Sequence, residues 1–420
     1  MTITLSRFAQ SVGFETAFSV LAVARQLKAA GKRVIELEIG DSPFPSTASA
    51  KRAGIAAIEA DQSHYCPSLG LPELRAAASR YVNREHRLQT TAACVIVAPG
   101  AKPFEQFFCE AVLDAGDGVL VFSPYFPTYL PNILRRGARP VLVPLRQEHE
   151  FRPDIAAIEQ FLRDDPQPKA IFLNSPHNPT GGVATEDDLR NIADAIRGRN
   201  IAVFSDEPYD QMVWRGRHHS LLAQPGMIDQ CVAAYTFSKS YSMSGWRLGF
   251  AVSSPALIEI MAKLLNTTLS CVPPLVQLAG AAALDYDTAE RDSTMQQFRR
   301  KVELLTAALN RVPGVKCLDP TATFYAFPSV AAICNRLGIT SHGLAMYLLE
   351  GADDRLGVAC LGGECFGEAG GGFIRFSCAE PDQALIEAVD FFADAVGRGD
   401  RLARYLDAHA AYRLAQPYRM

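Results

Sequence analysis

Short apolar runs alternate with longer amphipathic segments through the middle of the chain. Between positions 94 and 253 the apolar runs are rich in β-branched and aromatic residues, as buried strands are. Helical patterns lie between them, as in Phe104–Leu113, Asp154–Arg163 and Asp187–Arg197. This order predicts an α/β fold with a mainly parallel sheet covered by helices. We expect strands at Val95–Ala98, Val119–Phe122, Pro140–Val143, Ala170–Leu173, Ile201–Phe204, Val232–Phe237 and Leu248–Val252.

The pattern changes toward both ends of the chain. Long helices are expected at Ser11–Gly31 and Arg291–Asn310, and short strands near Phe324–Phe327 and Phe373–Ser377. The chain has 420 residues, whereas single cores stop growing at about 250 to 300 residues. We therefore expect a large domain over residues 46–287 and a smaller α+β domain built from residues 1–45 and 288–420.

Two C-terminal segments fall outside these elements. The glycine-rich stretch Gly362–Gly372 lacks the spacing and the following helix of a phosphate-binding loop. We expect it to be a flexible surface loop that leads into the strand carrying Arg375. The tail from Arg398 to Met420 is expected to form a surface helix.

Composition narrows the class of protein. Hydrophobic residues make up 48% and charged residues 20%, and the net charge is −4, which is ordinary for a globular protein and disfavours nucleic-acid binding. We find neither a signal peptide nor an apolar run near the ~18 residues of a membrane span, so we expect a cytoplasmic protein. The ten cysteines are scattered and no metal-ligand spacing occurs, so we expect no metal. The pair His218-His219 lies in a polar loop and is expected to face solvent.

Unusual chemistry follows four of the expected strands. The segments are the small-residue turn Pro99–Pro103, the loop Asn174–Gly181, the sequence Ser205–Tyr209, and Ser238-Lys239. Because ligands bind beyond the carboxyl ends of strands in open α/β sheets, we expect these segments to meet at one site. Each segment alone is weak evidence, since turn residues and solvated lysines are common.

Lys239 is the most informative of these residues. It follows an apolar strand and is surrounded by hydroxyl side chains and Arg247, so an amine lies inside an anion-binding cradle. An amine next to a bound phosphate suits a Schiff base with a phosphorylated aldehyde, and pyridoxal 5'-phosphate (PLP) is the obvious ligand. The other segments supply an anion cup, an acid for the ring nitrogen and donors for the ring hydroxyl.

The motifs resemble those of class I/II aminotransferases, which are fold-type I PLP enzymes similar to aspartate aminotransferase. The sequences Asn-Ser-Pro-His-Asn-Pro-Thr-Gly, Ser-Asp-Glu-Pro-Tyr and Ser-Lys followed by Gly-Trp-Arg-Leu-Gly occur in family order. Nearly the whole chain is covered. The resemblance implies transamination between an L-amino acid and a 2-oxo acid. It also implies that Lys239 carries the cofactor and moves the substrate proton, with Asp206 and Tyr209 as the other catalytic residues.

The resemblance also assigns binding roles. The substrate carboxylate is held by Arg375, Asn178 and the backbone of Gly40, and Asn178 also contacts the cofactor. Tyr65 matches a tyrosine that reaches the phosphate of the neighbouring subunit, which implies a homodimer. The remaining cofactor contacts are Phe126, stacked on the ring, and the phosphate-binding residues Gly100, Ala101, Lys102, Thr236, Ser238 and Arg247, the first three partly through backbone N–H groups.

Some residues depart from the family pattern. Phe126 replaces the commoner tryptophan, and Asp41-Ser-Pro follows Gly40 where the family often has Glu-Pro-Asp. No second arginine for a side-chain carboxylate is evident, so a dicarboxylic substrate stays open. Glu15 lies in a segment that often lines the substrate pocket, but we expect it to face solvent.

Two alternatives to transamination remain. The same lysine and aspartate support β-elimination, decarboxylation or cyclisation of an amino acid. A non-catalytic PLP-sensing regulatory domain needs a DNA-binding domain beside it, and the resemblance leaves no room for one.

Overall fold

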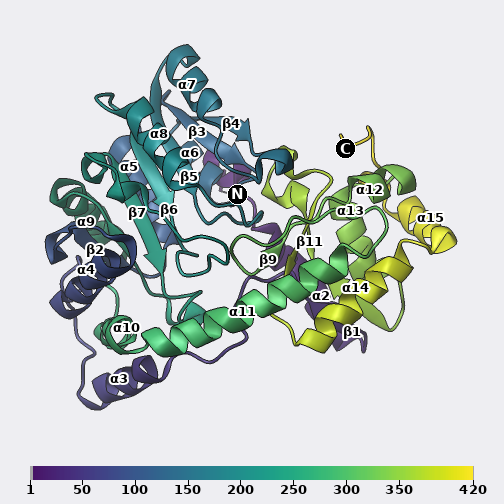
Figure 1. The fold of residues 1–420 in the computed structure, drawn as a ribbon, viewed down its shortest axis with the longest axis horizontal. Helices are drawn as coiled ribbons and strands as arrows, with labels where there is room; N and C mark the ends of the chain where they lie inside the picture. The colour runs from purple at the N-terminus through teal and green to yellow at the C-terminus, as the bar shows by residue number, and fades with distance from the viewer. Residues whose placement is uncertain (1–2, 420) are drawn as a thin grey trace.

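The computed structural model describes residues 3–419 and shows two groups of elements side by side (Figure 1). The first group surrounds a seven-stranded sheet with the order β2-β8-β7-β6-β5-β3-β4. Strands β3 to β7 run parallel, whereas β8 is antiparallel to both of its neighbours. The α/β prediction is confirmed, and every expected strand of this sheet is present. The strands are β2 Val95–Ala98, β3 Gly118–Ser123, β4 Arg139–Pro144, β5 Pro168–Asn174, β6 Ala202–Asp206, β7 Cys231–Thr236 and β8 Gly249–Val252.

Helices cover both faces of this sheet. Successive residues of a strand point to opposite faces, so Val119 and Val121 of β3 pack into one apolar cluster and Leu120 and Phe122 into another. The sheet is therefore buried on both sides, which explains its near-continuous apolar strands. The face of Val119 and Val121 packs against α5 (Lys102–Val112), α6 (Tyr129–Arg135) and α9 (Pro255–Leu269). The face of Leu120 and Phe122 packs against α4 (Pro72–His86), α7 (Ile155–Asp164), α8 (Glu186–Ile196) and α10 (Pro274–Tyr286). Helix α10 also contacts α3 (Ala48–Glu59).

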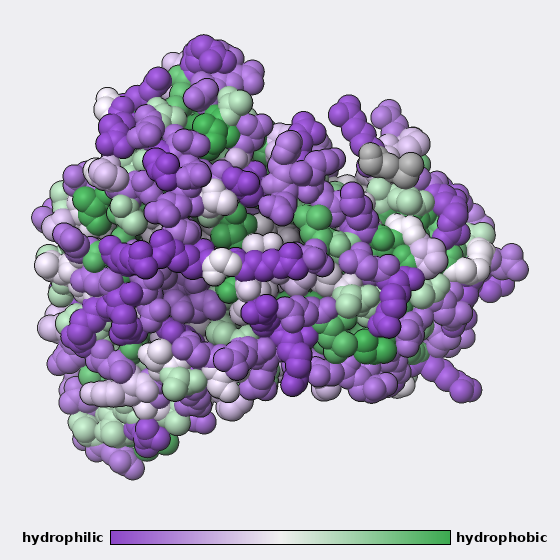
Figure 2. Space-filling view, in the orientation of Figure 1, coloured by the Kyte–Doolittle hydropathy of each residue, from purple (hydrophilic) through white to green (hydrophobic). Residues whose placement is uncertain are grey.

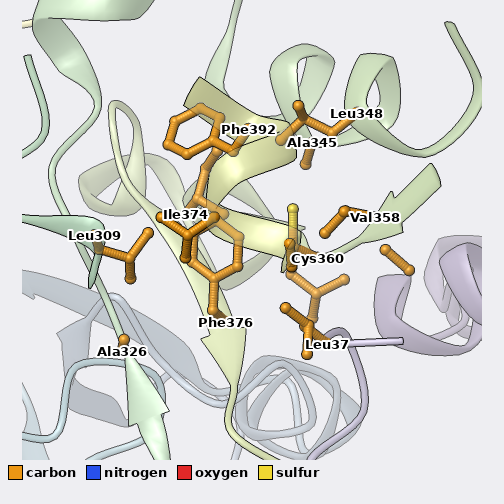
Figure 3. Packing of buried hydrophobic residues seen from close by; sticks show 14 of the residues in the cluster. Leu37, Leu309, Ala326, Ala345, Leu348, Val358, Cys360, Ile374, Phe376 and Phe392 are labelled. Carbon is orange, nitrogen blue, oxygen red and sulfur yellow. The ribbon is translucent and has the colours of Figure 1, made fainter. Parts of the chain in front are cut away.

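The second group combines both ends of the chain. Strand β1 pairs with β10 in parallel, and β12 pairs with β11 and β9 in antiparallel orientation. Its core joins residues far apart in sequence, including Leu37, Leu309, Ile374 and Phe392 (Figure 3). The elements are α2 Thr16–Ala29, β1 Arg33–Glu36, α11 Thr288–Leu309, β9 Tyr325–Ala326, α12 Ala331–Leu337, α13 Ser341–Met346, β10 Leu356–Ala359, β11 Leu361–Gly362, β12 Ile374–Ser377, α14 Asp382–Ala395 and α15 Gly399–Ala408.

One face of the molecule can be followed in the space-filling view. On the face shown in Figure 2, hydrophilic residues predominate and apolar residues lie in small groups. Within residues 3–419 no helix is both long enough and apolar enough to cross a bilayer.

The N-terminal helix differs from the prediction. Instead of one helix over Ser11–Gly31, the chain forms α1 (Arg7–Ser11) and α2 (Thr16–Ala29). The linking residues leave the helical conformation, with ψ of 123° at Val12 and 126° at Glu15. Gly13 lies inside this break, and a glycine in a helix interior is destabilising. The break places Glu15 directly before α2.

The glycine-rich stretch Gly362–Gly372 is not the flexible surface loop that we expected. Phe366 is only 2% exposed, and its carbonyl accepts a hydrogen bond of 2.8 Å from the N–H of Tyr125. A Cβ atom on Gly363 would lie 1.8 Å from the carbonyl oxygen of Gly370. The glycines therefore allow two backbone segments to pack directly together. Their spacing in the sequence is the same for close backbone packing as for a flexible loop, so the sequence alone does not separate the two.

The C-terminal tail is a helix only in part. Helix α15 is amphipathic and buries Leu402, Tyr405 and Leu406. Beyond it the N–H of Tyr418 donates to Asn335 at 2.8 Å, and the Tyr418 hydroxyl donates to Glu364. The end of the tail is thus hydrogen-bonded to Asn335 and Glu364 of the second group of elements.

Candidate active site

The carboxyl ends of β5, β6 and β7 open into a cavity of about 470 Å³ that residues of both groups line. Parallel strands bring their carboxyl ends to one edge of a sheet, which explains why segments distant in sequence converge there. Tyr65 is the exception among the expected residues: it lies outside the cavity and is 91% exposed. Gly100 borders the lining through its contact with Arg247. The expected residues that line the cavity are Gly40, Ala101, Lys102, Phe126, Asn178, Asp206, Tyr209, Thr236, Ser238, Lys239, Arg247 and Arg375.

Lys239 lies three residues beyond the end of β7. Its Nζ atom donates a hydrogen bond of 2.6 Å to the carbonyl oxygen of Gly40. The ring centroids of Tyr209 and Phe324 lie 5.9 and 5.7 Å from the same atom. The amine is therefore held at the junction of the two groups, with aromatic rings on one side and the cavity on the other.

Asp206 is the last residue of β6 and is buried. Burial raises the pKa of its carboxyl group to about 6, and the negative charge of Glu207 acts in the same direction. The hydroxyl of Tyr129 opposes this shift by donating a hydrogen bond of 2.5 Å to the carboxylate. A cation placed opposite Asp206 favours the ionised carboxylate, which is the state suited to pairing with a protonated ring nitrogen.

Arg375 connects the site to the second group of elements. Its Nη1 atom donates to the side-chain oxygen of Asn178 at 2.9 Å, and Nη2 donates to the backbone oxygen of Glu38 at 2.5 Å. The guanidinium carbon lies 4.4 Å from the ring centroid of Tyr325 and 5.0 Å from that of Phe366. These contacts fix a buried guanidinium in the cavity wall, where its planar fork matches a carboxylate.

A cradle suited to a phosphate lies at the opposite end. Arg247 donates from Nη1 to Ser244 at 2.8 Å and from Nη2 to Pro99 at 3.1 Å, both times to a backbone oxygen. Gly100 has a φ of +92°, and a Cβ atom there would lie 2.5 Å from Nη2 of Arg247. The adjoining start of α5 exposes the unpaired N–H groups of a helix N-terminus. Hydroxyl groups of Thr236 and Ser238 complete the lining.

Comparison with known proteins identifies the chain. Residues 32–390 match the family of class I and II aminotransferases. The chain belongs to this family. An aspartate aminotransferase of Streptomyces avermitilis is 33% identical over 402 residues, covering 92% of this chain and 95% of that protein. Aromatic-amino-acid aminotransferase 2 of Thermococcus litoralis is 28% identical over 361 residues, covering 85% of this chain and 90% of that protein. The structure of an aspartate aminotransferase from Thermus thermophilus with maleate aligns with a TM-score of 0.87 at 28% identity, covering 94% of this chain and 100% of that one.

The expectations of transamination and of PLP are thereby confirmed. This aminotransferase transfers an amino group between an amino acid and a 2-oxo acid, with PLP as its cofactor. The residues present fit that group, because a cationic cradle, a buried carboxylate and a lysine amine line one cavity. Within residues 3–419 no cluster of three or more metal-ligating side chains occurs.

Several residues of this aminotransferase site were missed in the sequence. Tyr129, which bonds Asp206, lies at the end of the aromatic segment that carries Phe126, and that proximity was the available signal. Tyr325 lines the cavity, and its hydroxyl lies 3.0 Å from that of Tyr209. Glu105 of α5 also lines it, and burial raises its pKa to about 8, with a further contribution from the charge of Asp206.

A buried polar network supports the loop that carries Asp206 and Tyr209. His218 lies 2.8 Å from the carboxylate of Glu207, and Tyr235 donates to the same carboxylate at 2.7 Å. Burial alone favours a raised pKa for Glu207, but the neighbouring histidines and hydrogen bonds outweigh it and lower the pKa. The expectation that His218 faces solvent is wrong, because the ring is buried against Glu207, the residue that directly follows β6. His219 remains partly exposed.

Proposed function

We propose that the Nζ atom of Lys239 would condense with the aldehyde of PLP and release water. The amino group of the substrate would then replace Nζ on that carbon, and the freed amine would move the proton of the substrate Cα. The supporting observation is the convergence of Lys239, Asp206 and Arg375 on one cavity from separate strands. When bound, PLP supplies an electron-withdrawing ring that stabilises negative charge on the substrate Cα. The amine faces this cavity with its Nζ atom bonded to the backbone oxygen of Gly40, a bond that it can exchange for the cofactor.

Asp206 holds the proton on the ring nitrogen in this proposal. The carboxylate ends β6 and is oriented by the Tyr129 hydroxyl, so its direction is fixed before the cofactor binds. The hydroxyl of Tyr209 and the side-chain N–H of Asn178 would each donate a hydrogen bond to the ring oxygen. Burial raises the pKa of Tyr209 well above its usual range, which keeps the hydroxyl protonated as a donor. Phe126 covers the ring face and excludes water.

The phosphate is bound at the far end of the cavity. Arg247 would supply the charge, Thr236 and Ser238 would supply hydroxyl groups, and Ala101 and Lys102 would supply backbone N–H groups. Gly100 would contact the phosphate without donating, because its N–H is bonded to the backbone oxygen of Ala98 at 2.8 Å. Support comes from the position of Ala101 and Lys102 at the start of α5, where a helix dipole adds to the positive potential. Arg375, Asn178 and the backbone of Gly40 hold the substrate carboxylate and thereby orient the Cα–H bond toward Lys239.

A half-reaction assay tests this function. Purified enzyme loaded with PLP is mixed with single L-amino acids, and we expect conversion of the cofactor to pyridoxamine phosphate with release of the matching 2-oxo acid. Release of ammonia and a keto acid without that conversion indicates elimination instead, and release of carbon dioxide indicates decarboxylation.

The attachment point has its own test. Borohydride reduction followed by peptide mass spectrometry is expected to place the cofactor on Lys239 in the wild type and on no residue in Lys239→Ala. A reduced adduct on another lysine contradicts the assignment.

We propose that the enzyme is a homodimer in the cytoplasm and that Tyr65 completes the phosphate site of the partner subunit. The exposure of Tyr65 and its distance from its own cavity support this assembly. Mixing inactive Tyr65→Ala and Lys239→Ala chains tests it. Random exchange creates hybrid dimers with one intact site, so about a quarter of wild-type activity should return. A strictly monomeric protein in sedimentation, or no recovery after proven exchange, contradicts it.

We further propose a division into a large domain over residues 46–287 and a small domain over 1–45 and 288–420. Separate apolar clusters support it: two flank the seven-stranded sheet, and one is built mainly from the chain ends.

The names of the relatives span aspartate and aromatic amino acids. The preference for one substrate side chain must therefore come from the residues that line this cavity.

A further inference from the structure

Four cationic side chains line the cavity within residues 3–419. They are Arg375, Arg247, Lys239 and Lys102. The proposed function assigns the first three to the substrate carboxylate, the phosphate and the cofactor aldehyde. Lys102 contributes a backbone N–H to the phosphate, which leaves its side-chain ammonium group as the cation able to meet a second carboxylate on a substrate.

That ammonium group is already paired. Nζ of Lys102 forms an ion pair with the carboxylate of Glu15 and lies 5.2 Å from the ring centroid of Phe126. Lys102 begins α5, whereas Glu15 directly precedes α2, so the pair joins the N-terminal segment to the cofactor-binding end of the sheet. The side chains are 43% and 20% exposed respectively, so the pair lies at the mouth of the cavity and not beneath it.

The neighbouring wall is apolar or acidic. Ala17 and Phe18, two and three residues after Glu15 in the chain, line the same cavity, as do Ile39 and Tyr325. Asp41 adds a further negative charge to the same lining. A substrate with a side-chain carboxylate must therefore displace Glu15 from Lys102 or approach like charges, whereas an apolar side chain meets matching surface.

We propose that Glu15 sets substrate specificity by neutralising Lys102, so that the enzyme prefers amino acids with uncharged, apolar side chains over aspartate and glutamate. This inference rests on the proposed transamination and goes beyond it by naming the substrate class and the residue that selects it. Glu15 pairs with the side-chain Nζ of Lys102 and not with the backbone N–H that is assigned to the phosphate, so Glu15→Gln keeps that N–H, Arg247 and Arg375 in the chain.

The test compares half-reaction kinetics of the wild type, Glu15→Gln and Glu36→Gln, each loaded with PLP. Glu36 is a matched control, because it pairs with Lys28 at 2.9 Å, with side chains 26% and 49% exposed, and lies outside the cavity. Donors are L-leucine, L-phenylalanine, L-aspartate, L-glutamate and L-lysine. We expect the wild type to use leucine or phenylalanine best. In Glu15→Gln the ratio of kcat/KM for aspartate to that for leucine should rise about tenfold, which corresponds to about 1.4 kcal/mol of transition-state binding. Glu36→Gln should leave the ratio unchanged.

Different results separate the two proposals. A wild type that prefers aspartate or glutamate, or a Glu15→Gln variant that loses activity equally with every donor, overturns the specificity role while transamination stands. Preference for L-lysine assigns Glu15 to the substrate itself and also overturns it. No conversion of the cofactor by any donor removes both proposals together.

Discussion

Replacing Gly100 by alanine separates the cost of backbone conformation from the cost of losing a phosphate ligand. The residue has a φ of +92°, and the added Cβ would lie 2.5 Å from Nη2 of Arg247. Gly31 is a matched control with the same φ of +92° and nothing within 4 Å of its added Cβ. Both alanine variants carry the left-handed backbone strain, which costs about 1 to 2 kcal/mol.

The difference between the two variants lies in the guanidinium group. It is the far end of a flexible and exposed side chain, so it can move away from the new methyl group and bond to water instead, with little further loss of folding stability. That movement breaks its hydrogen bond to Pro99 and withdraws it from the phosphate cradle. A hydrogen bond to a charged group contributes about 1.5 to 3 kcal/mol, so we expect Gly100→Ala to raise the Kd for PLP about 10- to 150-fold over that of Gly31→Ala.

The assay has two parts. Thermal unfolding of both proteins without cofactor should give similar decreases in Tm, and titration of the cofactor-free proteins with PLP, followed by absorbance, should give different Kd values. Equal PLP affinity in the two variants would refute the assignment of Arg247 to the phosphate.

Three further predictions concern single side chains. Burial raises the pKa of Asp206 from 3.8 to about 6, so the folded protein binds this proton more tightly than the unfolded chain. The cofactor-free wild type should therefore lose roughly 2.4 kcal/mol between pH 4 and pH 7 relative to Asp206→Asn, which urea unfolding across that range checks. In Arg375→Lys a bidentate donor becomes a point charge, so the KM for amino acids should rise at least about tenfold while the Kd for PLP stays constant in absorbance titrations; a parallel loss of PLP binding would move Arg375 to the phosphate end. Glu207→Gln breaks a buried pair with His218 and should lower the free energy of unfolding by about 3 to 5 kcal/mol in urea titrations, and a change below about 1 kcal/mol would contradict the importance of the network.

Local patterns in the sequence were sufficient for the main sheet. Each strand of β2 to β8 is an apolar run bounded by turns, so its position follows from its own residues. The residues placed after those strands, such as Lys239 and Asp206, converge because parallel strands end at one edge. Site residues attached to strand ends were therefore accessible to sequence reasoning.

Contacts between distant segments were not accessible in this way. The bond between Arg375 and Asn178 joins residues 197 positions apart, and Glu15 meets Lys102 across 87 positions. Nothing near His218 in the chain indicates that Glu207 will draw it into the interior. Glycine presents a further ambiguity, since the same residues serve mobile loops and close backbone packing, as in Gly362–Gly372.

The reversed strand β8 determines where Arg247 lies. Its first residue, Gly249, pairs with Thr236 at the end of β7 and with Ala98 at the end of β2. An antiparallel strand enters the sheet at the edge where its parallel neighbours leave, so a residue just before β8 reaches the same ligand as residues just after β2 and β7. A slip of two residues in this pairing would carry Arg247 about 7 Å along the sheet. Strand register thus contributes to the distance between the phosphate charge and the lysine. Mutations at the β7–β8 pairs outside the cavity lining, Ala233–Val252, Ala234–Ala251 and Tyr235–Phe250, should therefore alter cofactor binding.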